Sequence, residues 1–264
     1  MKIKMKNKLL SIVALCFVLL TAGCAKKEEN PDILNKIIKR DKIIVGVKYD
    51  TKPFGYINEK QELVGFDIDL AKHIAKFILG DENKVEFKRV TPANRILTLN
   101  SGKIDMIIAT MTITNQRTSI VDFSVPYYIA GQAILVPKDS KIKSIQDLNG
   151  KKVIVIFGTT AEESLRRIAP NVDIIGYKTY LKGYEALMQK KADAMASDDT
   201  ILLGFSLNNN AVEILPKRYT KEPYAVGFKK DVSSEKLKNK VDFILKNMVI
   251  SGELNSLKNK WLQN

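Results

Sequence analysis

The sequence predicts an α/β protein built as two similar lobes. Short runs of β-branched residues alternate with amphipathic helical stretches, a pattern typical of parallel sheets covered by helices. A helix end, a turn and a strand start recur at residues 99–106 and 187–194 with the same spacing of Leu, Lys and Asp. A chain of 264 residues, 45% hydrophobic and 27% charged, can bury two cores of ordinary domain size.

Individual elements follow from local periodicity. Residues 43–47 predict a first strand, and residues 69–79 predict a helix with one apolar face. A further strand is expected at residues 224–228, before helical sequence through Trp261. If that strand returns to the first lobe, two chain segments cross between the lobes and form a hinge beside a cleft.

The expected domain organisation has four parts. A signal peptide occupies residues 1–23, a lipid anchor and tether residues 24–40, lobe 1 residues 41–136 plus 225–264, and lobe 2 residues 137–224.

The N-terminus has the features of a secretory signal. Four lysines precede an apolar run at residues 9–20, which leads into the small residues before Cys24. This run is too short to cross a bilayer as a permanent transmembrane helix. Residues 20–24 resemble a bacterial lipobox, in which Cys24 would be acylated; a plain secretory signal is the alternative. Cleavage would remove Cys16 and leave a formal charge of +10.

Composition argues against most catalytic classes. One histidine and two cysteines exclude a disulfide framework and make a zinc cluster implausible, so no metal site is expected. No cofactor is expected either. His73 lies on the lysine-rich side of its helix, where solvent exposure explains it, and no Ser–His or Cys–His pair remains. The basic runs lack interleaved aromatic residues, which disfavours nucleic acid as a partner.

Three strand-to-helix turns could bind a ligand. Thr114 is a good helix N-cap, and Arg117 in the first turn opposes the helix dipole unless an anion lies nearby. Thr160 and Glu163 have capping-box spacing, which leaves Gly158 and Thr159 to offer N–H and hydroxyl groups to a ligand.

The third turn carries two adjacent aspartates, Asp198 and Asp199. Capping a helix needs only one of them. The other carboxylate could pair with an ammonium group.

Several sequence blocks resemble the polar amino-acid-binding proteins of ABC importers, solute-binding protein family 3. They are K-Y-D-T-K-P-F-G-Y at 48–56, G-F-D-I-D-L at 65–70, T-I-T-N-Q-R at 112–117, D-F-S-V-P-Y-Y at 122–128 and G-K-K-V at 150–153. The resemblance implies a type II periplasmic-binding-protein fold with a two-segment hinge. It also implies a non-enzymatic monomer that serves an ABC permease and ATPase, lipid-anchored outside the cytoplasmic membrane or periplasmic.

The same resemblance assigns ligand contacts by position. Arg117 would bind the α-carboxylate of an amino acid and Asp198 its α-ammonium, while Asp199 would cap the helix. Further polar contacts would come from Thr110, Thr112, Gly158 and Thr159.

The side-chain pocket resembles the aspartate/glutamate-binding branch. Lys48 stands where members for basic amino acids and one for glutamine have an aspartate, and Thr51 and Pro92 replace aromatic residues. Arg95 adds a second cation, and Tyr180 matches a tyrosine of the acidic branch.

Lys48 and Arg95 would then be two uncompensated positive charges. An acidic amino acid would neutralise one of them, since desolvating an unpaired charge costs several kcal/mol. The alternatives are a binder of glutamine or another polar amino acid, a sensor domain, or a dehydratase-like enzyme on the same fold.

Overall fold

The computed structural model describes residues 32–207 and 209–262. The predicted signal peptide at residues 1–23, the predicted acylation site Cys24 and the first part of the predicted tether lie outside the described residues. Within the described part, no helix combines the length and hydrophobicity needed to cross a membrane.

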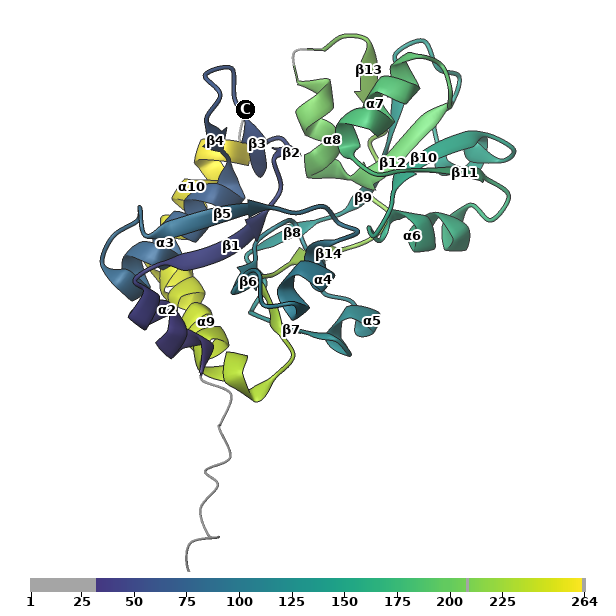
Figure 1. Ribbon diagram of the computed structural model, residues 1–264. Coiled ribbons are helices and arrows are strands. Elements are labelled where there is room, and N and C mark those ends of the chain that lie inside the picture. Colours follow the sequence, from purple (N-terminus) through teal and green to yellow (C-terminus); the bar gives the residue numbers. More distant parts are fainter. Residues whose placement is uncertain (1–31, 208, 263–264) are drawn as a thin grey trace, which may run out of the picture. The chain divides into compact units, whose positions relative to one another are not determined.

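The first sheet has the strand order β5-β1-β6-β15-β7, in which the neighbours β5 and β1 can be followed in Figure 1. Strand β1 lies parallel to β5 and β6, whereas β15 runs antiparallel to β6 and β7. The predicted strand at residues 43–47 is confirmed as β1. The bounds are β1 Ile43–Val47, β5 Val85–Arg89, β6 Met106–Ile107, β7 Val121–Phe123 and β15 Gly227–Lys229.

The second sheet has the order β11-β10-β12-β9-β13. Strand β10 lies parallel to β11 and β12, while β9 runs antiparallel to β12 and β13. The bounds are β9 Gln132–Pro137, β10 Lys152–Ile156, β11 Asp173–Tyr177, β12 Ala194–Asp198 and β13 Val212–Ile214. Each sheet therefore presents the carboxyl ends of parallel strands, where the side chains of the following turns gather.

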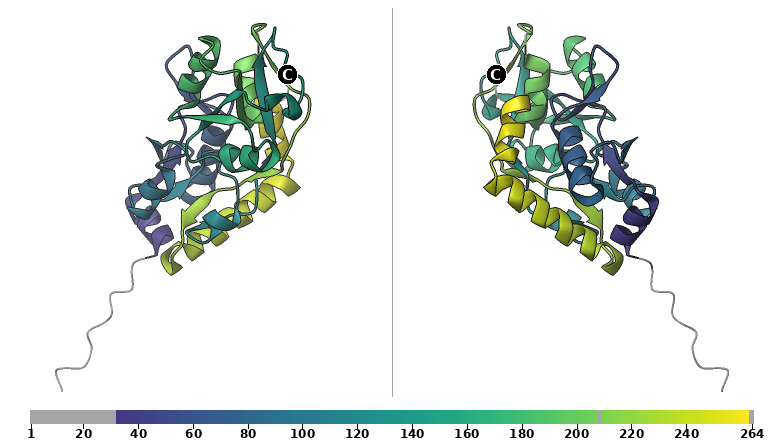
Figure 2. Two further views of the ribbon diagram at one scale, coloured as in Figure 1. Left: turned by 90° about the vertical axis from the view of Figure 1, so that its right-hand side faces the viewer. Right: turned by 90° about the vertical axis from the view of Figure 1, so that its left-hand side faces the viewer.

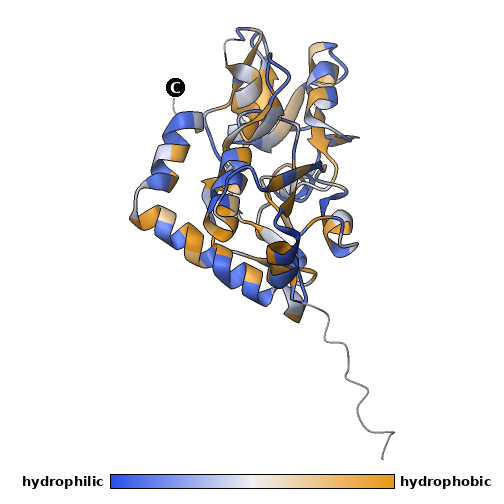
Figure 3. Cartoon of the chain, turned by 60° about the vertical axis from the view of Figure 1, so that its left-hand side comes forward, coloured by the Kyte–Doolittle hydropathy of each residue, from blue (hydrophilic) through white to orange (hydrophobic). Residues whose placement is uncertain are grey.

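Helices pack on both sheets. Those of the first lobe are α2 Ile33–Arg40, α3 Phe66–Leu79, α4 Arg95–Asn100, α5 Asn115–Thr118, α9 Glu235–Ile250 and α10 Glu253–Leu262. Those of the second are α6 Ala161–Ile168, α7 Tyr180–Met188 and α8 Asp199–Ser206, and short 3₁₀ turns occupy Ile145–Leu148 and Val232–Ser234. The yellow helices α9 and α10 lie on one outer side (Figure 2), and polar and apolar residues alternate along them (Figure 3).

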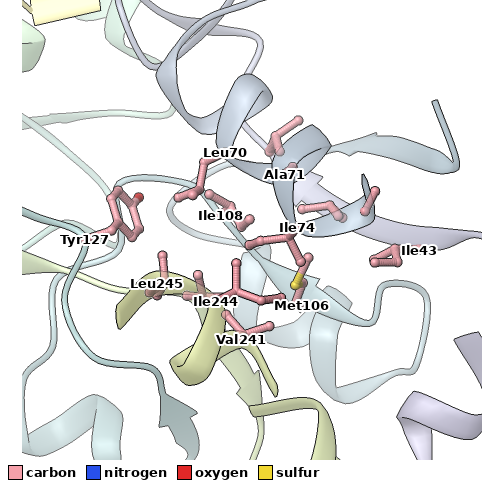
Figure 4. Packing of buried hydrophobic residues seen from close by; sticks show 14 of the residues in the cluster. Ile43, Leu70, Ala71, Ile74, Met106, Ile108, Tyr127, Val241, Ile244 and Leu245 are labelled. Atoms are coloured by element: carbon pink, nitrogen blue, oxygen red, sulfur yellow. The ribbon is translucent and has the colours of Figure 1, made fainter. Parts of the chain in front are cut away.

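One apolar cluster joins the first sheet to α3 and α9, and a second packs Leu99 of α4 against β6 and β7. Leu70 and Ile74 of α3 meet Met106 of β6 and Ile244 of α9, and all four side chains are fully buried (Figure 4). Gly65 is the residue before helix α3 and fixes where the helix starts. Its φ is +133°, and a Cβ there would lie 2.2 Å from the Phe54 carbonyl oxygen, so the position requires glycine.

Two short strands form the crossing between the sheets. Strand β8, Tyr128–Ala130, pairs antiparallel with β14, Glu222–Tyr224. The chain continues from β8 into β9 of the second sheet, and from β14 into β15 of the first. The expected return to the first lobe is confirmed, but the single strand predicted at 224–228 is divided into β14 and β15. A third, small sheet contains β2 Asp50–Thr51, β3 Gly55–Ile57 and β4 Leu63–Val64.

Two expected boundaries need correction. A tether through residue 40 is too long, because Asp32 caps helix α2 by accepting the Leu34 N–H at 2.8 Å and Ile37 is fully buried. Lobe 1 was expected to extend to residue 136, yet β9 pairs with β12 and thus belongs to the second sheet. Both errors arise because the sequence of a short segment does not reveal which element it packs against.

The core cluster makes a testable contribution to stability. Ile244→Ala should lower the free energy of unfolding by about 2–5 kcal/mol, because it removes buried methylenes and leaves a cavity. Ile250→Ala, in the same helix at 84% exposure, should change it by less than about 0.5 kcal/mol. Urea unfolding followed by circular dichroism measures both, and equal losses would contradict this assignment of the core.

Candidate functional site

The predicted ligand residues come from the turns that follow parallel strands and from helix starts. Seven of them are at least 91% buried: Lys48, Arg95, Thr110, Thr112, Arg117, Tyr180 and Asp198. The other two lie after β10, where Gly158 is exposed and Thr159 is half-buried. Hydrogen bonds join Lys48, Arg95, Thr110 and Tyr180 into one group. Arg117 bonds to Thr112, and Asp198 forms a second group with residues outside these seven.

The first group surrounds the ammonium group of Lys48. This group donates to the Thr110 hydroxyl and, at 3.2 Å, to the Tyr180 hydroxyl, and it lies 4.5 Å from the centre of the Tyr180 ring. Tyr180 begins α7 in the second lobe, so Lys48 links both lobes. Burial, and then repulsion by Arg95, lowers the pKa of Lys48 to about 7.

Thr110 has an unusual backbone conformation at the centre of this group. Its φ is +44°, a left-handed value that is costly for a β-branched residue. Its N–H donates to Asp67 Oδ2 at 3.1 Å, and the Tyr127 hydroxyl donates to Asp67 Oδ1 at 3.0 Å.

Arg95 is buried beside Thr110. Its Nη1 donates to the Ala109 carbonyl at 2.7 Å and to the Thr110 carbonyl at 3.5 Å, while its Nε has no partner among the described residues. Burial and the charge of Arg117 lower the pKa of Arg95 to about 9, so it stays protonated at neutral pH. Neither Lys48 nor Arg95 points to solvent.

Arg117 bridges the two lobes. Its Nη1 donates to the Thr112 carbonyl and its Nη2 to the Gly158 carbonyl, both at 2.9 Å. The predicted cap is confirmed, because the Thr114 hydroxyl accepts the Arg117 N–H at 3.2 Å. The guanidinium is thereby held at the boundary between the lobes.

The second group surrounds the carboxylate of Asp198. Gln132 Nε2 donates to its Oδ1, and the Tyr224 hydroxyl donates to its Oδ2. Gln132 also donates to the Thr160 hydroxyl at 3.1 Å, which in turn donates to Glu222 at 2.9 Å. Burial, and then the nearby charge of Glu222, raises the pKa of Asp198 to about 6.

The structure changes two predicted helix caps. Thr160 occupies the N-cap position of α6, but its side chain makes no capping bond because it serves Glu222 and Gln132 instead. Asp199 lies inside the first turn of α8 and not at its N-cap position. Its carboxylate still accepts the Thr200 N–H of that turn at 2.8 Å, and it also accepts from Arg218 Nε at 2.9 Å. Tertiary partners thus replace the local bond at Thr160 and add to it at Asp199.

The buried charges near these groups are balanced. Three cations, Lys48, Arg95 and Arg117, accompany three carboxylates, Asp67, Asp198 and Glu222. Two uncompensated positive charges were expected because Asp67 and Glu222 were not counted. Asp67 stands in an apolar stretch, a detectable sign of a buried acid, whereas nothing in the sequence near Glu222 indicates that it is buried.

The remaining titratable groups give no metal centre. In residues 32–207 and 209–262 no three His, Cys, Asp or Glu side chains are placed to hold a metal ion. The half-buried His73 pairs with Glu253 at 3.1 Å on the outer side of α3.

Comparisons with known proteins agree on one protein family for this chain. Residues 43–264 match the bacterial extracellular solute-binding proteins, family 3. The chain is 41% identical over 264 residues to the ABC transporter glutamine-binding protein GlnH of Bacillus subtilis (strain 168), covering 96% of each chain. It is also 41% identical over 242 residues to the glutamine-binding protein of Geobacillus stearothermophilus, covering 85% of this chain and 92% of that one.

A solved structure is similar over most of the chain. The cysteine-binding protein of Campylobacter jejuni superposes with a TM-score of 0.83 at 35% identity, covering 88% of this chain and 93% of that one. Relatives of similar fold therefore differ in the amino acid they are named for, and side chains in the site must decide between ligands.

The raised pKa of Asp198 predicts a pH-dependent stability. The folded protein retains a proton on Asp198 that the unfolded chain releases above about pH 4, so this carboxyl stabilises the fold at low pH and loses that effect as the pH rises through about 6. The unmodified protein should therefore lose stability between pH 4.5 and pH 7, whereas Asp198→Asn lacks this titration. The free energy of unfolding of Asp198→Asn, minus that of the unmodified protein, should rise by about 1–3 kcal/mol over this pH interval.

Urea unfolding of both proteins at the two pH values measures this difference. A difference that does not change with pH would show that Asp198 is ionised in the folded protein at pH 4.5.

Proposed function

Because the chain belongs to the bacterial extracellular solute-binding proteins of family 3, with the two α/β lobes of the type II periplasmic-binding-protein fold, we propose that it captures glutamine and delivers it to an ABC importer. Binding of an amino acid for an ABC transporter is the activity of this group of relatives. Two relatives that share 41% of their residues with this chain are named for glutamine.

The proposed contacts to the ligand head group use opposite charges on the two lobes. Arg117 binds the α-carboxylate, because a planar guanidinium can donate two parallel hydrogen bonds to it. Asp198 accepts from the α-ammonium. Polar groups of Thr112, Gly158 and Thr159 complete the head-group contacts.

The single observation that favours glutamine is the balance of buried charge. In formal charge, the three buried cations and three buried carboxylates sum to zero, and a zwitterionic ligand with a neutral side chain preserves that sum. Glutamate would add one negative charge to a weakly screened site. Lys48 and Arg95 can instead donate hydrogen bonds to the amide oxygen of glutamine.

Glutamate is the second candidate. Its support is the pair Lys48 and Arg95, whose donors include an Arg95 Nε without a partner among the described residues. A side-chain carboxylate would accept from these groups more strongly than an amide oxygen does.

Ligand binding would also hold the two lobes together. Arg117 and Lys48 lie in the first lobe and Asp198 and Tyr180 in the second, so a ligand contacts both lobes only when they are close. Its contacts then favour the closed arrangement, which the permease of an importer would recognise. Acylation of Cys24 is proposed to keep the protein at the outer face of the cytoplasmic membrane.

Calorimetric titration tests the ligand assignment. Glutamine should bind with a micromolar or lower Kd, as expected for about ten well-buried heavy atoms. Glutamate should bind at least about tenfold more weakly because of its added charge, and arginine more weakly still. A tighter Kd for glutamate would contradict the proposal and favour the second candidate.

Prolonged incubation separates binding from catalysis. Glutamine recovered unchanged after overnight incubation with the protein, by mass spectrometry, is the expected result. Any new product formed in proportion to protein concentration would contradict a pure binding function and favour the dehydratase-like alternative.

Arg117→Met should weaken glutamine binding by about 100-fold or more, because two charge-assisted hydrogen bonds are lost. Arg89→Met is a matched control, since Arg89 lies exposed at the end of β5, and its Kd should stay within about twofold. Thermal melting of both variants checks folding. Equal Kd values would place Arg117 outside the ligand contacts.

A further inference from the structure

We propose that Thr110 is a positioning residue for Lys48: its hydroxyl fixes the ammonium group of Lys48 and thereby sets recognition of the ligand side chain. This inference rests on the proposed function, in which Lys48 faces the side chain of glutamine. It differs from the direct polar contact to the ligand that the family resemblance implies for Thr110.

The first support is the hydrogen bonding of the Thr110 side chain. Its oxygen accepts from Lys48 Nζ, and both residues are at least 96% buried. Lys48 has only one other side-chain hydrogen bond among the described residues, to the Tyr180 hydroxyl. Because Tyr180 belongs to the second lobe, Thr110 is the partner from the lobe of Lys48 itself.

The second support is the strained backbone at Thr110. A φ of +44° costs about 1–2 kcal/mol for a residue with a Cβ, and a β-branched side chain is especially unfavourable there. Glycine would adopt this conformation without that cost. A threonine at this position therefore requires a contribution from its side chain, and the bond to Lys48 supplies one.

The third support is the way in which the neighbours hold this conformation. The N–H of Thr110 donates to Asp67 Oδ2 at 3.1 Å, and its carbonyl accepts from Arg95 Nη1 at 3.5 Å. Asp67 is itself fixed by the Tyr127 hydroxyl at 3.0 Å. Backbone and side-chain groups of Thr110 thus contact three buried charged residues, so its hydroxyl has little freedom to turn away from Lys48.

A mobile Lys48 ammonium group would lose part of its contribution to the ligand. The lysine ammonium sits at the end of a flexible four-carbon chain, so it keeps one position only where hydrogen-bond partners fix it. Burial also makes a lost partner costly, because the charged group cannot compensate with bulk water. Removing the hydroxyl should therefore affect ligands that use Lys48 and spare ligands that do not.

The test compares Thr110→Ser with Thr110→Ala. Both variants lose the γ-methyl group and keep a Cβ in the left-handed region, so they differ only in the hydroxyl. Each is titrated with glutamine and with norvaline, which has the same α-carbon groups and a side chain without an amide. Norvaline affinity is measured by displacement where direct titration is too weak.

The expected result is a loss confined to glutamine. Thr110→Ser should keep the glutamine Kd within about threefold of the unmodified protein. Thr110→Ala should raise it by about tenfold, the factor expected for one hydrogen bond to a charged group, while the norvaline Kd changes by less than about threefold.

Three results would overturn the inference and leave the proposed function intact. Equal losses for glutamine and norvaline in Thr110→Ala would assign the hydroxyl to the ligand head group. Unchanged glutamine binding in Thr110→Ala would show that Lys48 does not need it. Loss of folding in Thr110→Ala with Thr110→Ser folded, seen by circular dichroism, would make the hydroxyl structural and overturn the inference as well. Failure of the unmodified protein to bind glutamine would instead refute the proposed function.

Discussion

The structure depends on the burial of six charged side chains where the two lobes meet. A charge removed from water is tolerated only with a nearby opposite charge and hydrogen-bond partners. Lys48, Arg95 and Arg117 satisfy this with Asp67, Asp198 and Glu222, mostly through intervening hydroxyl, amide and carbonyl groups. The other buried carboxylate of the described residues, Asp105, is paired separately with Arg40.

This constraint explains why the site residues lie at strand ends, in turns and at helix starts, and not in the interior of the sheets. The interior of β1 and β10 is apolar, and the polar residues begin where the strands end. Backbone groups that no longer pair in a strand are available there, and Arg95 and Arg117 use such carbonyls as acceptors. The strained Thr110 lies at one of these turns, consistent with strain being retained where groups must be held for a ligand.

The crossing segments take part in the same network. Gln132 at the start of β9 and Tyr224 at the end of β14 both donate to Asp198. A ligand that contacts Asp198 is therefore one hydrogen bond away from each chain segment that joins the lobes. Such an arrangement suits a protein whose binding and lobe movement are coupled.

Sequence by itself determined the α/β class, the first strand, the strand that returns to the first lobe and the helical C-terminus, because these depend on local periodicity. It also indicated which turns collect polar residues, and the cap at Thr114. It did not reveal that Thr160 bonds to Glu222, that Asp67 accepts from the Thr110 N–H, or that β9 joins the second sheet. These depend on groups brought together from distant parts of the chain. Only the tertiary structure decided the sum of buried charge, since a charge is compensated by its neighbours in space.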